Sequence, residues 1–338
     1  MRVTLRSLVA AFALAIAVFI AAPISAQQPT SVNPTAASVK EQQLMQALQA
    51  GTPGAGSTLS GRITIPDASA ANLIQPQGQA WRAFHQGAMH WVGAIAILGM
   101  LGLLAVFYFT RGKIMIDSGL SGVKILRFST FERFIHWLTA GCFIILALSG
   151  LNVTFGKFVV APLLGEDAFA TLAQGAKIAH NFLAWPFMLG LVFMFVVWVF
   201  HNIPNSTDIT WIKQGGGLVG GGHPPAKKFN AGQKVIFWAV IIGGGLLSVS
   251  GVYLLFPGSA GGVLALQFWN IVHGLVSVLL IAMMIAHIYI GSVGMEGASD
   301  AMTSGEVDLN WAKEHHSLWV EEEMAKGKAL PPSAQPAE

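Results

Sequence analysis

The chain has 338 residues, of which 54% are hydrophobic and 10% charged, and its mean hydropathy is +0.60. Because a soluble globular protein carries roughly 25% charged residues, this composition excludes a purely soluble domain and indicates a membrane protein. The net charge of +3 gives no support for a nucleic-acid partner. The single cysteine, Cys142, excludes an internal disulfide, a cysteine-ligated iron–sulfur cluster and a covalently attached haem.

The N-terminal residues 1–26 have the pattern of a secretory signal peptide. Arg2 and Arg6 flank the start of an apolar run, and small residues follow it, with cleavage expected after Ala26. An uncleaved anchor helix is the alternative. Residues 27–87 are rich in Ala, Gln, Pro, Ser and Thr and show no helical period, which predicts an exported, mostly extended polar segment.

Five apolar runs follow, each close to the roughly 20 residues that a helix needs to cross a bilayer. They lie at 88–110, 134–155, 178–201, 235–256 and 269–292. The predicted fold class is therefore an all-α membrane protein, a bundle of about five transmembrane helices. The last residues, 324–338, are predicted to form a disordered cytoplasmic tail.

The distribution of basic residues predicts the orientation of this bundle. Segments 111–133, 213–234 and 313–328 carry twelve Lys and Arg, whereas the loops on the other side carry only Lys157 and Lys177. By the positive-inside rule the basic segments are cytoplasmic. We therefore expect a multi-pass protein of the bacterial inner membrane, with a periplasmic mature N-terminus and a cytoplasmic C-terminus.

Four histidines lie inside the apolar runs at two depths. His273 and His287, fourteen residues apart, would share one helix face and lie about 21 Å apart along its axis. His136 lies at the inner start of the second run and His180 at the outer start of the third. Depth therefore pairs His136 with His287 and His180 with His273. Two such pairs are typical of two bis-histidine haems, whose irons have no open position and carry electrons.

Other roles for these histidines stay open at this stage. A histidine in a membrane can bond two helices in a structural anchor or relay protons in a transporter. His85 and His90, at the outer start of the first run, are not predicted to bind haem. The remaining histidines are predicted to lie at the surface or in subunit contacts: His201, His223, His315 and His316.

Residues 124–323 resemble the cytochrome b (gamma) subunit, of the cytochrome b556 type, of membrane-bound respiratory formate dehydrogenase. The matching stretches are "FERFIHW", "KIAHNF", "HNIPNSTDITW", "KFNAGQK", "FWNIVHG", "MMIAHIYIG" and "WAKEHHSLWVEEE". The cytochrome b subunits of nickel–iron hydrogenases and thiosulfate reductases have histidines at similar depths and remain alternatives. Short family members begin near Lys124 and have four membrane helices, so the helix at 88–110 is an addition to a four-helix diheme core.

The resemblance implies two haem b groups and a quinone as electron acceptor, menaquinone or ubiquinone. It assigns the outer haem to His180 and His273, and the inner haem to His136 and His287. It places Asn230, Gly232 and Gln233 in a quinone pocket beside the inner haem. Taken alone, "KFNAGQK" is a polar turn before a membrane helix, in which Asn230 could equally be a helix cap.

The resemblance also implies partners, because the chain has no motif for oxidising formate itself. The implied partners are an iron–sulfur beta subunit, a catalytic alpha subunit with molybdenum or tungsten, membrane lipid, and further copies of this heterotrimer. In such a complex the chain would be an electron-transfer subunit without catalytic residues of its own.

Overall fold

The computed structural model describes residues 76–218 and 222–326. Five helical stretches in it are long and apolar enough to cross a membrane, which confirms the all-α bundle. They span Trp81–Arg111, Thr130–Val159, Glu166–His201, Ala231–Leu255 and Val263–Gly294. The signal peptide, most of the exported segment and the end of the tail lie outside the described residues.

The first membrane helix begins earlier than the sequence predicted. Helix α3 (Pro76–Ala83), a π-helical turn (Phe84–Ala88) and α4 (Met89–Arg111) follow one another without a break. The prediction of an extended segment up to residue 87 is therefore wrong for residues 76–87. Proline is favoured at the first position of a helix, and the Gln, Ala and Arg that follow Pro76 are good helix formers, so this stretch continues α4 outward.

A side chain caps the first turn of four of the other helices: α5 (Thr130–Val159), α8 (Ser206–Lys213), α9 (Ala231–Leu255) and α12 (Leu309–Ala325). Ser129 and Glu132 form a capping box at α5, and Asn205 and Asp208 form one at α8. The remaining long helices are α7 (Glu166–Trp198), α9 (Ala231–Leu255) and α10 (Val263–Tyr289), with the single-turn α6 (Ala161–Leu164) between α5 and α7.

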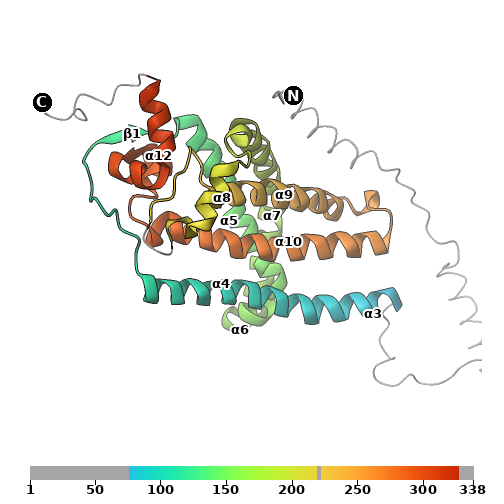
Figure 1. Ribbon diagram of the computed structural model, residues 1–338. Coiled ribbons are helices and arrows are strands. Elements are labelled where there is room, and N and C mark those ends of the chain that lie inside the picture. Colours follow the sequence, from blue (N-terminus) through green and yellow to red (C-terminus); the bar gives the residue numbers. More distant parts are fainter. Residues whose placement is uncertain (1–75, 219–221, 327–338) are drawn as a thin grey trace, which may run out of the picture.

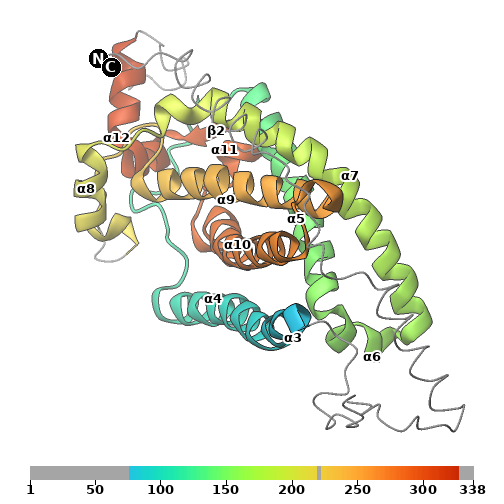
Figure 2. The same ribbon diagram turned by 90° about the vertical axis from the view of Figure 1, so that its right-hand side faces the viewer.

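The bundle has two parts in contact with each other. Helices α4, α10 and α9 lie side by side in that order, and α5 packs along α7, which also contacts α9 (Figures 1 and 2). Most apolar side chains of α4 are exposed, as expected for a helix at the edge of a bundle in lipid. The core of the described residues lies between α5, α7 and α9 and extends to the C-terminal segment.

A small sheet and two helices close one end of the bundle (Figure 1). Strand β1 (Lys124–Leu126) pairs antiparallel with β2 (Glu306–Asp308), between α11 (Asp300–Thr303) and α12 (Leu309–Ala325). The carboxylate of Asp308 accepts hydrogen bonds from the backbone N–H groups of Ser121, Gly122 and Asn310 at 3.1, 3.0 and 2.9 Å. Burial acts to raise the pKa of Asp308, but these hydrogen bonds outweigh it and lower that pKa below its ordinary value.

His316 was expected at the surface, and the structure shows that this was wrong. Its side chain is 1% exposed. Arg127 Nη2 donates to His316 Nε2 at 2.9 Å and to the Lys228 carbonyl at 2.7 Å, and His316 Nδ1 donates to the Lys227 carbonyl at 2.7 Å. Helix α12 brings His316 inward because the same helix packs Trp311 and Trp319 against the Arg127 guanidinium. Histidine is tolerated there because each ring nitrogen has a partner.

Candidate functional site

The structure brings together the same two pairs of histidines that depth had matched. The ring centroids of His180 (α7) and His273 (α10) are 6.2 Å apart, with 60° between the ring planes. Those of His136 (α5) and His287 (α10) are 6.3 Å apart, also at 60°. Helix α10 therefore carries one member of each pair: His287 lies two residues before its end at Tyr289, and His273 lies fourteen residues earlier.

This separation suits one metal ion between each pair of rings. A metal–imidazole nitrogen bond is about 2.0–2.1 Å long and a ring nitrogen lies roughly 1 Å from the ring centre, so two imidazoles on opposite sides of one metal have centroids roughly 6 Å apart. The separation in both pairs is therefore compatible with one iron held between the two rings, which would supply one-electron transfer.

Two serines that sequence reasoning missed orient the rings of one pair. Ser149 Oγ lies 2.8 Å from His180 Nδ1, and Ser250 Oγ lies 2.9 Å from His273 Nδ1. Both hydroxyls donate to backbone carbonyls of their own helices, so each accepts the N–H of its histidine. A hydrogen bond at Nδ1 leaves Nε2 as the nitrogen available to a metal and increases the basicity of the ring. His136 Nδ1 has no such partner among the described residues.

A glycine follows each of these serines and leaves room beside the ring. A Cβ atom at Gly150 would lie 3.6 Å from His180 Cε1, and one at Gly251 would lie 3.4 Å from His273 Cε1. Larger side chains at these positions would press on the imidazoles and on the space between them. The Ser-Gly step in "LALSG" and again in "LLSVSG" was the signal in the sequence that could have identified both serines.

A cavity of about 790 Å³ adjoins the His180–His273 pair. Its lining is mainly apolar, with a few polar groups, which is the usual character of a cofactor site of 300–1,000 Å³. The lining residues come from α3, the π-helical turn, α4, α5, α7, α9 and α10. His85, for which no haem role was predicted, lines this cavity, whereas His90 bonds to the carbonyls of His85 and Thr154.

The residues predicted to bind quinone lie at the start of α9 and form its cap. Asn230 Oδ1 accepts from the Gln233 backbone N–H at 2.9 Å, and Gln233 Oε1 accepts from the Asn230 N–H at 3.1 Å. A Cβ atom on Gly232 would lie 3.1 Å from the Trp211 ring. The structure thus shows the capping role that had been the alternative for Asn230.

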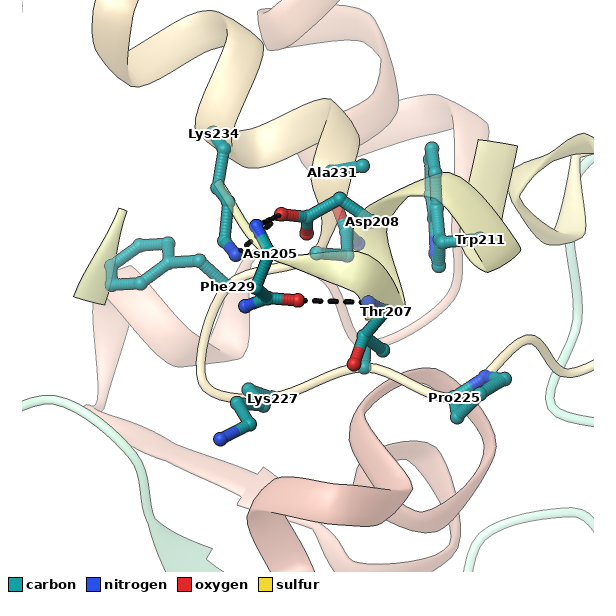
Figure 3. A pocket seen from close by; sticks show the side chains of 11 residues that line it. Asn205, Thr207, Asp208, Trp211, Pro225, Lys227, Phe229, Ala231 and Lys234 are labelled. Atoms are coloured by element: carbon teal, nitrogen blue, oxygen red, sulfur yellow. Dashed lines mark hydrogen bonds and ion pairs between the residues drawn. The ribbon is translucent and has the colours of Figure 1, made fainter. Parts of the chain in front are cut away.

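A shallow pocket lies between α8 and the start of α9 (Figure 3). Asn230 lines it, while Gly232 and Gln233 do not. Figure 3 shows Lys234 pointing toward Asp208, and their ion pair measures 2.8 Å. Because Lys234 is 4% exposed, this buried pair ties α9 to α8 and holds one wall of the pocket.

The family assignment rests on the central part of the chain. Residues 127–305 match the family described as prokaryotic cytochrome b561. The formate dehydrogenase cytochrome b556(fdo) subunit of Escherichia coli strain K12 is 35% identical over 202 residues, which are 59% of this chain and 92% of the relative.

Two further relatives agree with this assignment. The nitrate-inducible formate dehydrogenase cytochrome b556(Fdn) subunit of the same strain is 33% identical over 212 residues, 60% of this chain and 94% of the relative. The formate dehydrogenase cytochrome b556 subunit of Haemophilus influenzae is 27% identical over 210 residues, 60% of this chain and 84% of the relative. The chain thus belongs to the prokaryotic cytochrome b561 family and, within it, groups with the cytochrome b556 subunits of formate dehydrogenase.

Proposed function

We propose that this chain is the membrane anchor of a formate dehydrogenase and conducts electrons through two bis-histidine haem b groups. The observation that supports this most directly is the pair of matched ring separations, 6.2 and 6.3 Å, each suited to one iron. The relatives are named as cytochrome b556 subunits of formate dehydrogenase, which favours a formate dehydrogenase over a hydrogenase or a thiosulfate reductase as the partner enzyme.

The chain's own residues would hold and orient the haems. His180 and His273 are the proposed ligands of the outer haem, and His136 and His287 those of the inner haem. Because α10 contributes one ligand to each, its rigid backbone sets the spacing between the two sites at about 21 Å along the helix axis. A bound haem would supply one-electron transfer without an open position for substrate.

The anchor needs a donor and an acceptor on opposite sides of the membrane. We propose that an iron–sulfur subunit, itself reduced by a molybdenum or tungsten subunit that oxidises formate, delivers electrons at the outer pair. Quinone would take two electrons and two protons on the cytoplasmic side, near the inner pair. Charge would then cross the membrane as electrons, so turnover would contribute to a proton-motive force.

The proposed quinone site is the start of α9, with Asn230, Gly232 and Gln233. The shallow pocket that Asn230 lines, next to a buried Lys234–Asp208 ion pair, offers polar groups at the membrane boundary. The capping box occupies the side-chain oxygens of Asn230 and Gln233, so their NH₂ groups are the atoms proposed to donate to a quinone carbonyl.

Isolation of the chain from gently solubilised membranes tests this function. We expect haem b bands in the reduced-minus-oxidised spectrum, two haems per chain, and reduction of both on addition of formate to the isolated complex. A preparation without haem b would reject electron transfer and favour a transporter. Haem b that hydrogen reduces and formate does not would keep the mechanism and reject formate dehydrogenase.

A further inference from the structure

The first membrane helix lies outside the part of the chain that matches the family, residues 127–305. It nevertheless packs on α10 beside the outer histidine pair. Met89 is 4% exposed, and a Cβ atom on Gly274, the residue after His273, would lie 2.9 Å from Met89 Cε. One turn further along, a Cβ atom on Gly93 would lie 2.9 Å from the Phe155 ring. Glycines on both sides of the contact let the helix approach closely.

One face of this helix lines the cavity next to His180 and His273. The lining residues from this helix are Trp81, Phe84, His85 and Met89. His85 and Phe84 lie in the π-helical turn, and turns of this kind are frequent at functional sites. His90 holds the turn in place, because its ring lies 2.8 Å from the His85 carbonyl and 2.9 Å from the Thr154 carbonyl of α5.

Polar side chains on two neighbouring helices face the same outer end of the cavity. Lys177 precedes His180 by three residues in α7, and Asn270 precedes His273 by three residues in α10, and both line the cavity. Residues three apart share a helix face, so each polar side chain lies about one turn outward of a proposed ligand. Deeper in the membrane the lining includes Phe187, Val278 and Ile281.

This arrangement matches the shape of a haem, an apolar macrocycle with two propionates on one edge. We propose that the added N-terminal helix completes the outer haem site, and that His85 with Lys177 holds the haem propionates at its outer rim. The inference rests on the proposed function, because it needs a haem at the His180–His273 pair. On this proposal the added helix, which lies outside the segment that matches the family, influences the reduction potential of the haem that receives the electrons.

The electrostatic consequence is a shift in reduction potential. Positive charge and N–H donors near the propionates offset their negative charge, which otherwise favours the ferric over the ferrous iron. Loss of either group should therefore lower the midpoint potential of the outer haem and leave that of the inner haem unchanged.

Redox titration of the complete complex, followed by haem b absorbance, tests this. We expect Lys177→Gln and His85→Leu each to move the outer midpoint to lower potential, and His85→Gln, which keeps an N–H donor, to restore part of the shift. Lys157→Gln is the matched control, because this lysine lies near the outer end of α5 and does not line the cavity. It should leave both potentials unchanged.

The outcomes of this titration distinguish an error in the propionate site from an error in the proposed function. If the wild-type complex shows two haems and both potentials are unchanged in Lys177→Gln and His85→Leu, the propionate site is wrong and the function stands. If the wild-type complex lacks a second haem, the proposed function itself fails. If His85→Leu removes the outer haem and leaves the inner one, completion of the site by the added helix is supported.

Discussion

At the scale of single residues, the outer and inner histidine pairs differ in what holds their rings. His180 and His273 each bond to a serine through Nδ1, whereas His136 Nδ1 is buried and has no partner in the described part of the chain. A hydrogen bond at Nδ1 fixes the tautomer and the ring orientation of a ligand and increases its electron donation. We therefore expect the binding of the outer haem to depend on Ser149 and Ser250, whereas His136 has no such partner.

Replacement of single ligands should remove the haems selectively. We expect His180→Ala or His273→Ala to abolish the outer haem, and His136→Ala or His287→Ala to abolish the inner one, because each iron needs both axial imidazoles. Haem content per chain and the midpoint potential of the remaining haem b would be measured in each variant. Two haems retained in any of these variants, or loss of the same haem, identified by its midpoint potential, from both a His180 and a His136 variant, would reject the depth pairing.

The serines should tune the outer haem without being its ligands. In Ser250→Ala the His273 ring loses its acceptor at 2.9 Å, so the imidazole becomes a weaker donor and the outer midpoint potential should rise. Binding of the outer haem should weaken by about 10- to 100-fold. Ser292→Ala is the control, because that hydroxyl bonds to a backbone carbonyl of its own helix. Identical potentials in Ser250→Ala and the wild type would show that the bond has no electronic effect.

At the scale of elements, the first turn of α9 has two candidate roles that one substitution can separate. Glutamate forms a capping box as well as glutamine does, so Gln233→Glu should keep the cap and remove the amide N–H donors. We expect slower quinone reduction with both haems and the thermal stability retained. Gln233→Leu should slow quinone reduction too, and it removes only the reciprocal bond from the Asn230 N–H, because Asn230 Oδ1 still accepts from the backbone N–H of residue 233. Wild-type quinone turnover in both variants would exclude this turn from the quinone site.

The C-terminal helix α12 should respond to acid through His316. Burial, together with the Arg127 charge, lowers the pKa of His316 well below its ordinary value of 6.5, while burial lowers the pKa of Arg127 to about 9. Folded His316 therefore stays neutral at pH values at which the histidine of the unfolded chain takes up a proton. Its contribution to stability is present above pH 6.5 and is lost as the pH falls below that value.

Hydrogen exchange in α12 measures this loss. We expect the amides of α12 to exchange faster as the pH falls from neutral to below 6.5, after correction for the intrinsic pH dependence of exchange. Burial also lowers the pKa of the neighbouring His315, to about 4, which acts in the same direction. His316→Gln should flatten much of this dependence. Protection that stays constant over this range in the wild type would contradict the linkage.

At the scale of the whole molecule, the sidedness of electron transfer depends on orientation. The sheet, α11 and α12 gather at one end of the bundle (Figure 1), where the basic segments 111–133, 213–218 and 222–234 also lie. By the positive-inside rule we expect this end to be cytoplasmic. A reporter fused after Glu338 should therefore be active in the cytoplasm. Periplasmic activity of that reporter would reverse the orientation and with it the assignment of outer and inner haems.

The sequence alone determined the class, the five membrane helices and the pairing of four histidines. It could do so because an α-helix in lipid satisfies its own backbone hydrogen bonds, so apolar length predicts a span and residue number predicts depth. It missed the helical start at Pro76, because the polar composition of 76–87 outweighed its helix-forming residues. It placed His316 at the surface, because nothing in "KEHHSLW" tells which of two adjacent histidines faces inward.

Only the tertiary structure decided which groups from different helices meet. Ser149 and Ser250 become partners of histidines 31 and 23 residues away, and His85 reaches the cavity of His180 and His273 although it belongs to the added helix. The physical reason is that residue number gives the depth of a side chain along its own helix. Which side chains of different helices touch depends instead on how the helices are rotated and packed against one another.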